Sequence, residues 1–257
     1  MHAAQRLPRP SSNWALFLDV DGTLLDIAET PDAVEVPGGM VSLLRELLDC
    51  FGGALALVSG RPIETLDRFF DPLRPPAAGL HGLERRAADG AIAHYPLSAA
   101  ALDSVRARLA AAEREIEGLL LEDKGQTLAV HYRQAPAREQ EARRLVAEAA
   151  HDLGSDFELL EGKHVLEIRP RGAGKDKVVE AFMAKPPFRG RTPVFIGDDR
   201  TDEDGFAAVN RRGGHSIRVG GEGPSAARYR IADVASLRAW LAEVAAAVPR
   251  IESGRRP

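Results

Sequence analysis

Three short apolar runs mark the chain, and each one ends in a polar segment. They are Trp14–Leu18, Ala54–Val58 and Pro193–Ile196, followed by Asp-Val-Asp-Gly-Thr, Ser-Gly-Arg and Gly-Asp-Asp. A short continuous apolar run bounded by turn residues is typical of a buried parallel strand. We therefore predict three such strands with polar groups at their carboxyl ends.

A helical period follows the first run, because Val41, Leu44, Leu47 and Leu48 share one face before a Gly-Gly pair. Strands that alternate with helices predict an α/β fold, a doubly wound parallel sheet of Rossmann-like type. In such sheets, ligands gather at the carboxyl edge of the strands.

Between the second and third runs the pattern changes, which predicts an inserted α+β domain of roughly 85 residues. Segments 126–132 and 163–168 alternate like half-exposed strands, and the Ala- and Arg-rich segments 99–117 and 137–152 favour helices. The predicted boundaries give a discontinuous core of residues 1–83 and 170–257 and an inserted domain of residues 84–169.

The composition is that of a globular protein: 257 residues, 44% hydrophobic and 28% charged. Its net charge of -4 comes from interspersed acids and bases, so we expect neither a nucleic-acid nor a membrane partner. A single cysteine, Cys50, excludes an internal disulfide and fits a reducing compartment. We expect a cytoplasmic monomer.

Asp19 and Asp21 are two residues apart at a strand end, so both side chains point to the same side if the strand persists. Two carboxylates about 4 Å apart repel by roughly 4 kcal/mol at an effective dielectric near 20, and need a cation or a shared proton. A calcium loop is excluded, because Leu24 and Thr30 occupy its glycine and glutamate positions. A solvated acidic turn remains the alternative.

A second acidic cluster, Asp198, Asp199, Asp202 and Glu203, follows the third run. Asp202 and Glu203 could also serve only to favour a helix start. Oxygen ligands from separate strand ends, without histidine or cysteine nearby, suit Mg²⁺.

Hydroxyl and cationic groups complete the pattern. Ser59, Gly60 and Arg61 follow the second run, where backbone N–H groups at a helix start could hold phosphate oxygens. Lys175 could hold the charge of the phosphate. It does not belong to a nucleotide-binding P-loop, because Asp176 stands where that motif needs serine or threonine.

Together, D-x-D-G-T, S-G-R, Lys175 and G-D-D-x-x-D resemble, in this order, the four motifs of the haloacid dehalogenase (HAD) superfamily. The position of the insert resembles that superfamily's type-two cap. The resemblance implies Asp19 as a phosphate-accepting nucleophile and Asp21 as general acid and then base. Ser59 and Lys175 would steady the phosphoryl oxygens.

The same resemblance implies Mg²⁺ as cofactor, held by the carboxylates of Asp19 and Asp198 and the backbone carbonyl of Asp21. Asp199 or Asp202 would orient metal-bound water or Lys175, so all five acids are candidate metal-site residues.

The stretches 79–84, 122–124, 130–133, 161–163 and 167–170 resemble the cap signatures of trehalose-phosphate phosphatases. This implies that a sugar phosphate is the substrate. His81 and His131 are expected to have positioning or packing roles, with His81 near the site. The alternative for the charged residues of the inserted domain is a polar face that only contacts solvent. The implied substrate-binding residues are Gly60, Arg61, His81, Gly82, Glu122, Lys124, Arg133, Lys163 and Glu167.

The implied reaction is Mg²⁺-dependent hydrolysis of trehalose 6-phosphate to trehalose and phosphate, the last step of trehalose biosynthesis. Alternatives are a phosphatase for sucrose phosphate or mannosylglycerate phosphate, a phosphomutase, and a non-catalytic sugar-phosphate sensor. A sensor would have lost the nucleophile or the metal acids, and none is missing here.

Overall fold

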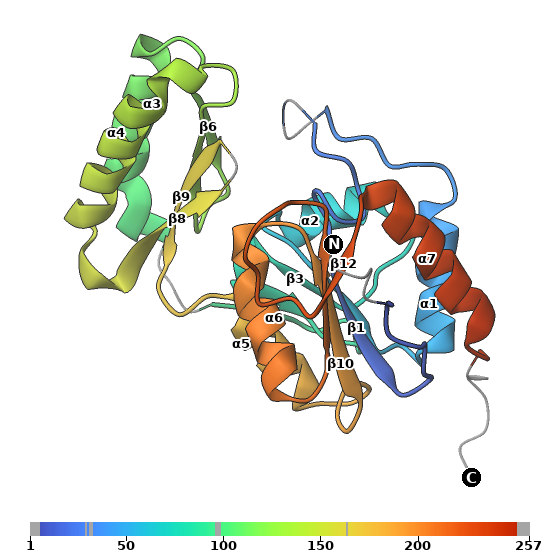
Figure 1. The fold of residues 1–257 in the computed structure, drawn as a ribbon. Helices are drawn as coiled ribbons and strands as arrows, with labels where there is room; N and C mark the ends of the chain where they lie inside the picture. Colours follow the sequence, from blue (N-terminus) through green and yellow to red (C-terminus); the bar gives the residue numbers. More distant parts are fainter. Residues whose placement is uncertain (1–5, 29, 31–32, 96–98, 163, 251–257) are drawn as a thin grey trace. The chain divides into compact units, whose positions relative to one another are not determined.

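The computed structural model describes residues 6–28, 30, 33–95, 99–162 and 164–250. It divides into two compact units (Figure 1): a core unit of residues 1–93 and 174–257 and an inserted unit of residues 94–173. The predicted boundaries at 84 and 169 therefore differ from the observed division. Residues 84–86 lie with the core unit because they pair antiparallel with strand 77–79 of the core sheet.

The core unit contains an eight-stranded sheet, and the predicted α/β fold is confirmed. Its first six strands are parallel, and β4 turns antiparallel. The three predicted strands are the neighbours β10, β1 and β2. In spatial order the strands are β12 (Tyr229–Ile231), β11 (His215–Val219), β10 (Thr192–Gly197), β1 (Trp14–Asp19), β2 (Leu55–Val58), β3 (Ala77–Gly79), β4 (Glu84–Arg86) and β5 (Ile92–His94).

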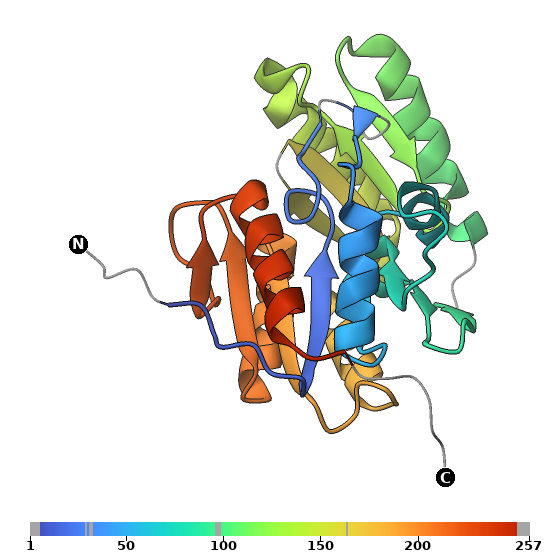
Figure 2. The same ribbon diagram turned by 90° about the vertical axis from the view of Figure 1, so that its right-hand side faces the viewer.

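Helices cover both faces of this sheet. Helix α1 (Met40–Cys50) packs beside α7 (Val234–Ala247), and α5 (Lys175–Met183) packs beside α6 (Glu203–Arg211) on the other face (Figures 1 and 2). The shorter elements are α2 (Ile63–Phe69), η2 (Leu80–Gly82) and η6 (Arg200–Asp202). None of the described helices combines the length and the apolar composition that crossing a bilayer requires.

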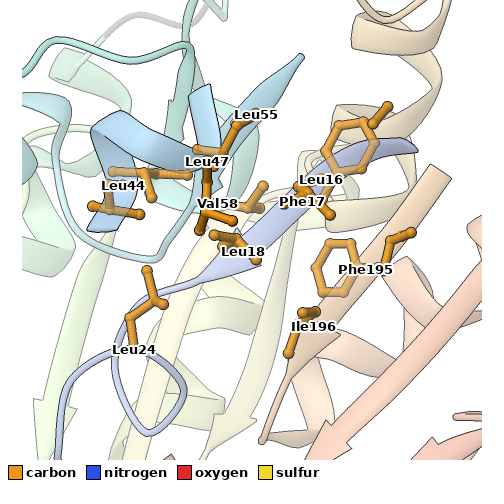
Figure 3. Close-up of a cluster of buried hydrophobic side chains, with 14 of the residues drawn as sticks. Leu16, Phe17, Leu18, Leu24, Leu44, Leu47, Leu55, Val58, Phe195 and Ile196 are labelled. Atoms are coloured by element: carbon orange, nitrogen blue, oxygen red, sulfur yellow. The ribbon is translucent and has the colours of Figure 1, made fainter. Parts of the chain in front are cut away.

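Strand β1 is buried along its whole length, which explains why it is continuously apolar. Leu18 belongs to one buried cluster with Leu44 of α1 (Figure 3). On the opposite pleat, the Phe17 ring lies 6.5 Å from Phe195 and 6.1 Å from Phe182 of α5. Since side chains alternate along a strand, β1 joins both helical layers to the sheet and is fixed from two sides.

The inserted unit is an antiparallel sheet with two helices, as predicted for an α+β lobe. Helices α3 (Asp103–Glu115) and α4 (Glu139–Asp152) lie on the same face of the sheet (Figure 1) and bury its apolar side chains. The strand order is β6 (Leu120–Asp123), β7 (Leu128–His131), β9 (Val165–Pro170) and β8 (Phe157–Gly162). Three 3₁₀ turns, Ala99–Leu102, Pro136–Arg138 and Gly154–Asp156, complete it.

Replacing Leu44 by alanine should destabilise the core unit by about 2–5 kcal/mol, because the Leu44 side chain is fully buried and its loss leaves a cavity. Denaturant unfolding followed by circular dichroism measures this. The matched control is Leu43→Ala on the same helix, where the side chain is only partly buried and a smaller loss is expected. Equal losses for both variants would contradict the packing described.

Candidate active site

Three neighbouring strands bring the predicted catalytic segments to one edge of the core sheet. In β1 and β10, Leu18 lies opposite Ile196, so Asp19 is level with Gly197 and Asp198 comes one residue later. On the other side, Asp19 lies opposite Val58, and Ser59 comes next. Because all three strands are parallel, residues about 40 and 180 positions from Asp19 meet at one carboxyl edge, as expected for this fold class.

Carboxylates of Asp19, Asp198 and Asp202 form the group suited to a metal ion, with one oxygen of each within 4.8 Å of the others. The Lys175 ammonium donates to Asp19 Oδ1 at 2.7 Å and to Asp202 Oδ1 at 2.5 Å. Lys175 is 2% exposed. Two of the three acids, Asp19 and Asp202, thus share one buried ammonium.

The pKa values of Asp19, Asp198 and Lys175 show how strongly these buried charges interact. Burial, together with Asp202, raises the pKa of Asp19 well above its usual range, and Lys175 offsets only part of this. Burial and the neighbouring acids Asp202 and Asp199 raise the pKa of Asp198 to about 7. Burial opposes charge on Lys175, but Asp19 and Asp202 outweigh it and raise its pKa above the ordinary value.

The cluster therefore carries more negative charge than one lysine balances. Its donors are all carboxylate oxygens, the ligands that hard divalent cations such as Mg²⁺ prefer. The residues present fit such a cation.

Asp202 has a structural role in addition. It is fully buried, and its Oδ2 accepts the backbone N–H groups of Asp198 at 3.1 Å and Asp199 at 3.0 Å. The Asp199 side chain accepts from the N–H of Arg200 at 2.7 Å. These bonds are consistent with the helix-start interpretation of Asp202, and Asp199 caps η6 as well, but neither role accounts for the bond between Asp202 and Lys175.

Glu203, the last acid of this segment, supports a loop. Its carboxylate accepts from Ser225 Oγ at 2.7 Å and from the N–H of Ala226 at 2.6 Å. Glu203 therefore holds the connection between β11 and β12.

Gly22 and Thr23 shape the turn after β1. Thr23 Oγ1 donates to Asp198 Oδ1 at 3.2 Å. Gly22 has φ of 81°, and a Cβ added there would lie 2.2 Å from Asp198 Oδ2. Only glycine combines this backbone conformation with so close an approach. The D-x-D-G-T motif thus positions a carboxylate about 175 residues away, a role that sequence reasoning did not assign to Thr23.

Asp21 lies apart from the acidic group, because β1 ends at Asp19 and the chain then turns, so the condition for a close pair of Asp19 and Asp21 is not met. Both Asp21 oxygens accept from Arg61, its Nε and Nη2 each at 2.8 Å. The Arg61 guanidinium also lies 5.0 Å from the Phe69 ring centre. The structure therefore places Arg61, predicted for substrate, on the predicted general acid.

The loop after β2 is hydrogen-bonded to the η2 turn and packs closely against it. The N–H of His81 donates to the Ser59 carbonyl at 3.0 Å, and Ser59 Oγ accepts from the N–H of Arg61 at 3.0 Å. A Cβ on Gly60 would lie 2.7 Å from His81 Nε2, and one on Gly82 would lie 2.7 Å from Val178. His81 itself has φ of 55°, an uncommon conformation for a non-glycine residue.

Lys175 opens helix α5, with Gly174 before it as N-cap. Asp176 occupies the first turn, where a negative charge favours the positive end of the helix dipole. The non-glycine residue after the lysine is therefore compatible with the helix start.

In the inserted unit, Glu122, Lys124 and Glu167 come together on the sheet face opposite to the helices. Glu122 and Glu167 lie opposite Ala129 from either side. Lys124 Nζ lies 3.6 Å from Glu122 Oε2 and 3.6 Å from Glu167 Oε2. Arg133 follows the end of β7 and is half-buried. Lys163 lies outside the described residues.

Sequence reasoning missed an ion pair on the same face. Arg169, two residues after Glu167, donates from Nε to Glu158 Oε1 on β8 at 2.8 Å. Strand alternation could have indicated this residue, since Arg169, two positions after Glu167, lies on the same face of the sheet.

Comparisons with known proteins identify the family to which the chain is similar. The family model "Trehalose-phosphatase" matches residues 17–235. The chain is 48% identical to a probable trehalose-phosphate phosphatase of Sinorhizobium fredii, covering 91% of this chain and 88% of the relative. It is 42% identical to the trehalose-6-phosphate phosphatase of Escherichia coli, covering 97% and 93%.

Solved structures show the same fold. A trehalose-6-phosphate phosphatase related protein superposes with a TM-score of 0.77 at 27% identity, covering 90% of this chain and 96% of that one. The C-terminal domain of the Candida albicans trehalose-6-phosphate phosphatase also gives 0.77, over 92% and 93%, and at 19% identity it supports the fold alone.

Replacing Gly22 by alanine should weaken binding of a divalent cation by at least about a hundredfold, because the new methyl group displaces the Asp198 carboxylate. Titration calorimetry with Mg²⁺ measures the affinity. The matched control is Gly39→Ala, which has a similar φ of 88° but nothing within 4 Å of its Cβ. Gly39→Ala should keep the affinity; a loss in both variants would point to backbone strain instead.

Proposed function

Because the chain belongs to the trehalose-phosphatase family, we propose that it hydrolyses trehalose 6-phosphate to trehalose and inorganic phosphate, the last step of trehalose biosynthesis. The observation that carries the proposal is the convergence of Asp19, Lys175 and Asp198 at one sheet edge. The names of the two relatives above support the substrate. A non-catalytic sensor is disfavoured, because the nucleophile and the acids are all present.

Asp19 is the proposed nucleophile. Its Oδ1 accepts from Lys175, and Oδ2 accepts no hydrogen bond from the described residues, so Oδ2 can attack phosphorus. An O–P bond to Asp19 forms as the P–O bond to the sugar breaks. Lys175 has three N–H donors and uses two on Asp19 and Asp202, which leaves one for a phosphoryl oxygen.

Asp21 is the proposed acid and base. It donates a proton to the departing sugar oxygen and later takes one from the water that attacks the aspartyl phosphate, which releases phosphate and restores Asp19. To do so, the Asp21 carboxyl must first exchange its bonds to Arg61 for a proton and for the substrate oxygen. We assign Arg61 to the phosphate once this exchange has taken place, in keeping with the substrate role predicted for it. Ser59 would donate to a phosphoryl oxygen.

Mg²⁺ is the proposed cofactor, held by the carboxylates of Asp19 and Asp198. When bound, it would offset the repulsion between these acids and a dianionic phosphate. Asp202 already uses both oxygens within the protein, so we assign it to the orientation of Lys175. Asp199 and the carbonyl of Asp21 remain proposed contributors to the metal site.

The charged face of the inserted sheet is the proposed sugar site. Glu122, Lys124 and Glu167 present donors and acceptors that suit sugar hydroxyls through charge-assisted hydrogen bonds. Arg133 and Lys163 are included on the family resemblance, and His81 and Gly82 because the η2 turn lies beside Ser59.

A cytoplasmic location and a monomeric state remain predictions. The buried Cys50 thiol, which donates to the carbonyl of Val248 at 3.3 Å, is consistent with a reducing compartment.

Replacing Asp19 by asparagine should lower turnover by at least about a thousandfold, because the amide cannot attack phosphorus. Phosphate release from trehalose 6-phosphate measures this. Asp176→Asn, on the same helix as Lys175 but outside the acidic group, is the control and should keep most activity. Retained turnover in the Asp19 variant would refute the assigned nucleophile.

A panel of phosphate esters tests the substrate. With Mg²⁺ present, kcat/KM for trehalose 6-phosphate should exceed that for glucose 6-phosphate and sucrose 6-phosphate by at least about tenfold, since the inserted sheet face would bind both rings of trehalose. A chelator should abolish hydrolysis of every ester. Faster turnover of another sugar phosphate would replace the proposed substrate while keeping the phosphatase chemistry.

A further inference from the structure

His131 contacts the charged face of the inserted sheet, although neither the sequence motifs nor the proposed reaction gives it a defined role. It lies two residues after Ala129 on β7, so its side chain lies on the same face as those of Glu122 and Glu167. Its Nε2 lies 2.9 Å from Glu122 Oε2. A carboxylate only accepts, so Nε2 carries the hydrogen of this bond.

This bond is the direct hydrogen bond that orients the Glu122 carboxylate. Lys124 Nζ is also near Glu122 Oε2, but at 3.6 Å and shared with Glu167 it contributes charge rather than a defined direction. Both contacts use Oε2. Among the described residues none donates to Oε1, which leaves that oxygen available as an acceptor.

The bond also keeps Glu122 charged. Burial alone would raise the pKa of Glu122, but the hydrogen bond from His131 and the charge of Lys124 outweigh it and hold the pKa below its ordinary value. A carboxylate that stays ionised at neutral pH and has one oxygen fixed is a pre-organised acceptor for a hydroxyl group.

We infer that His131 is a positioning residue for sugar recognition, fixing Glu122 through Oε2 so that Oε1 accepts a hydroxyl of the sugar. The inference rests on the proposed function, because it assigns Glu122 to the sugar. It assigns no contact between His131 and the substrate.

Kinetics of His131→Ala test the inference on two substrates, trehalose 6-phosphate and p-nitrophenyl phosphate, which has no sugar. The variant should raise KM for the sugar phosphate about tenfold with kcat changed less than about twofold, because a lost orienting bond weakens binding and leaves the phosphate chemistry intact. Hydrolysis of p-nitrophenyl phosphate should be unchanged. His131→Gln, whose Nε2 can replace the donor, should restore KM to within about threefold of the wild type.

Two further variants make the test specific. His151→Ala, which removes an exposed histidine from α4 of the same unit, should change neither substrate's kinetics. Adding His131→Ala to Glu122→Ala should give no further rise in KM, because the histidine acts through the glutamate.

An unchanged KM in His131→Ala, an equal loss on both substrates, additive effects in the double variant or no rescue by glutamine would each overturn the inference. If the wild type prefers another sugar phosphate, the proposed substrate fails, and the same comparison on the preferred ester decides the role of His131.

Discussion

The ion pairs of Lys175 are the interaction on which the core-unit site depends. One ammonium at the start of α5 links the end of β1 to the loop after β10, segments that are far apart in the chain. A buried charge without a partner is destabilising by several kcal/mol, so each of these groups requires the others. Because the acids outnumber the lysine, part of the negative charge of this group is not balanced by Lys175. The electrostatics that hold the edge together therefore also prepare it for a cation.

Acids of the same type do different work at this edge because their surroundings differ. Both Asp202 oxygens are used by Lys175 and by backbone N–H groups, so Asp202 acts as a structural support. Asp198 receives a bond from Thr23, and Gly22, which has no Cβ, leaves room for its carboxylate beside the turn. Asp21 lies outside the group, because the chain turns after Asp19 and the Asp21 carboxylate binds Arg61. Counting carboxylates would not distinguish these roles; counting the hydrogen-bond partners of each oxygen does.

The sequence indicated which strands meet, because a fully buried parallel strand must be apolar and the polar residue after it must lie at the sheet edge. It did not indicate that β1 stops at Asp19, since the pairing of Asp21 with Arg61 depends on the path of the turn. The sequence also did not indicate that the core sheet continues through β4, because β4 is polar. Arg86 there is 5% exposed, yet its guanidinium donates to Asp67 at 2.8 Å and to the Pro75 carbonyl at 2.9 Å. An ion pair that buries an arginine in a sheet has no periodic signal in the sequence.

In the inserted sheet, alternation predicts the face of a residue but not its partner. On that face Lys124 lies between two glutamates, and Arg169 pairs with Glu158, so these cations are matched by carboxylates. Such a surface has many oriented donors and acceptors but little excess positive charge, which suits the neutral hydroxyls of a sugar better than a phosphate. Phosphate, by contrast, suits the Lys175 ammonium and the acidic group of the core unit, which fits a cation. The two halves of a sugar phosphate thus call for two different electrostatic environments, and the proposed function assigns one to each unit.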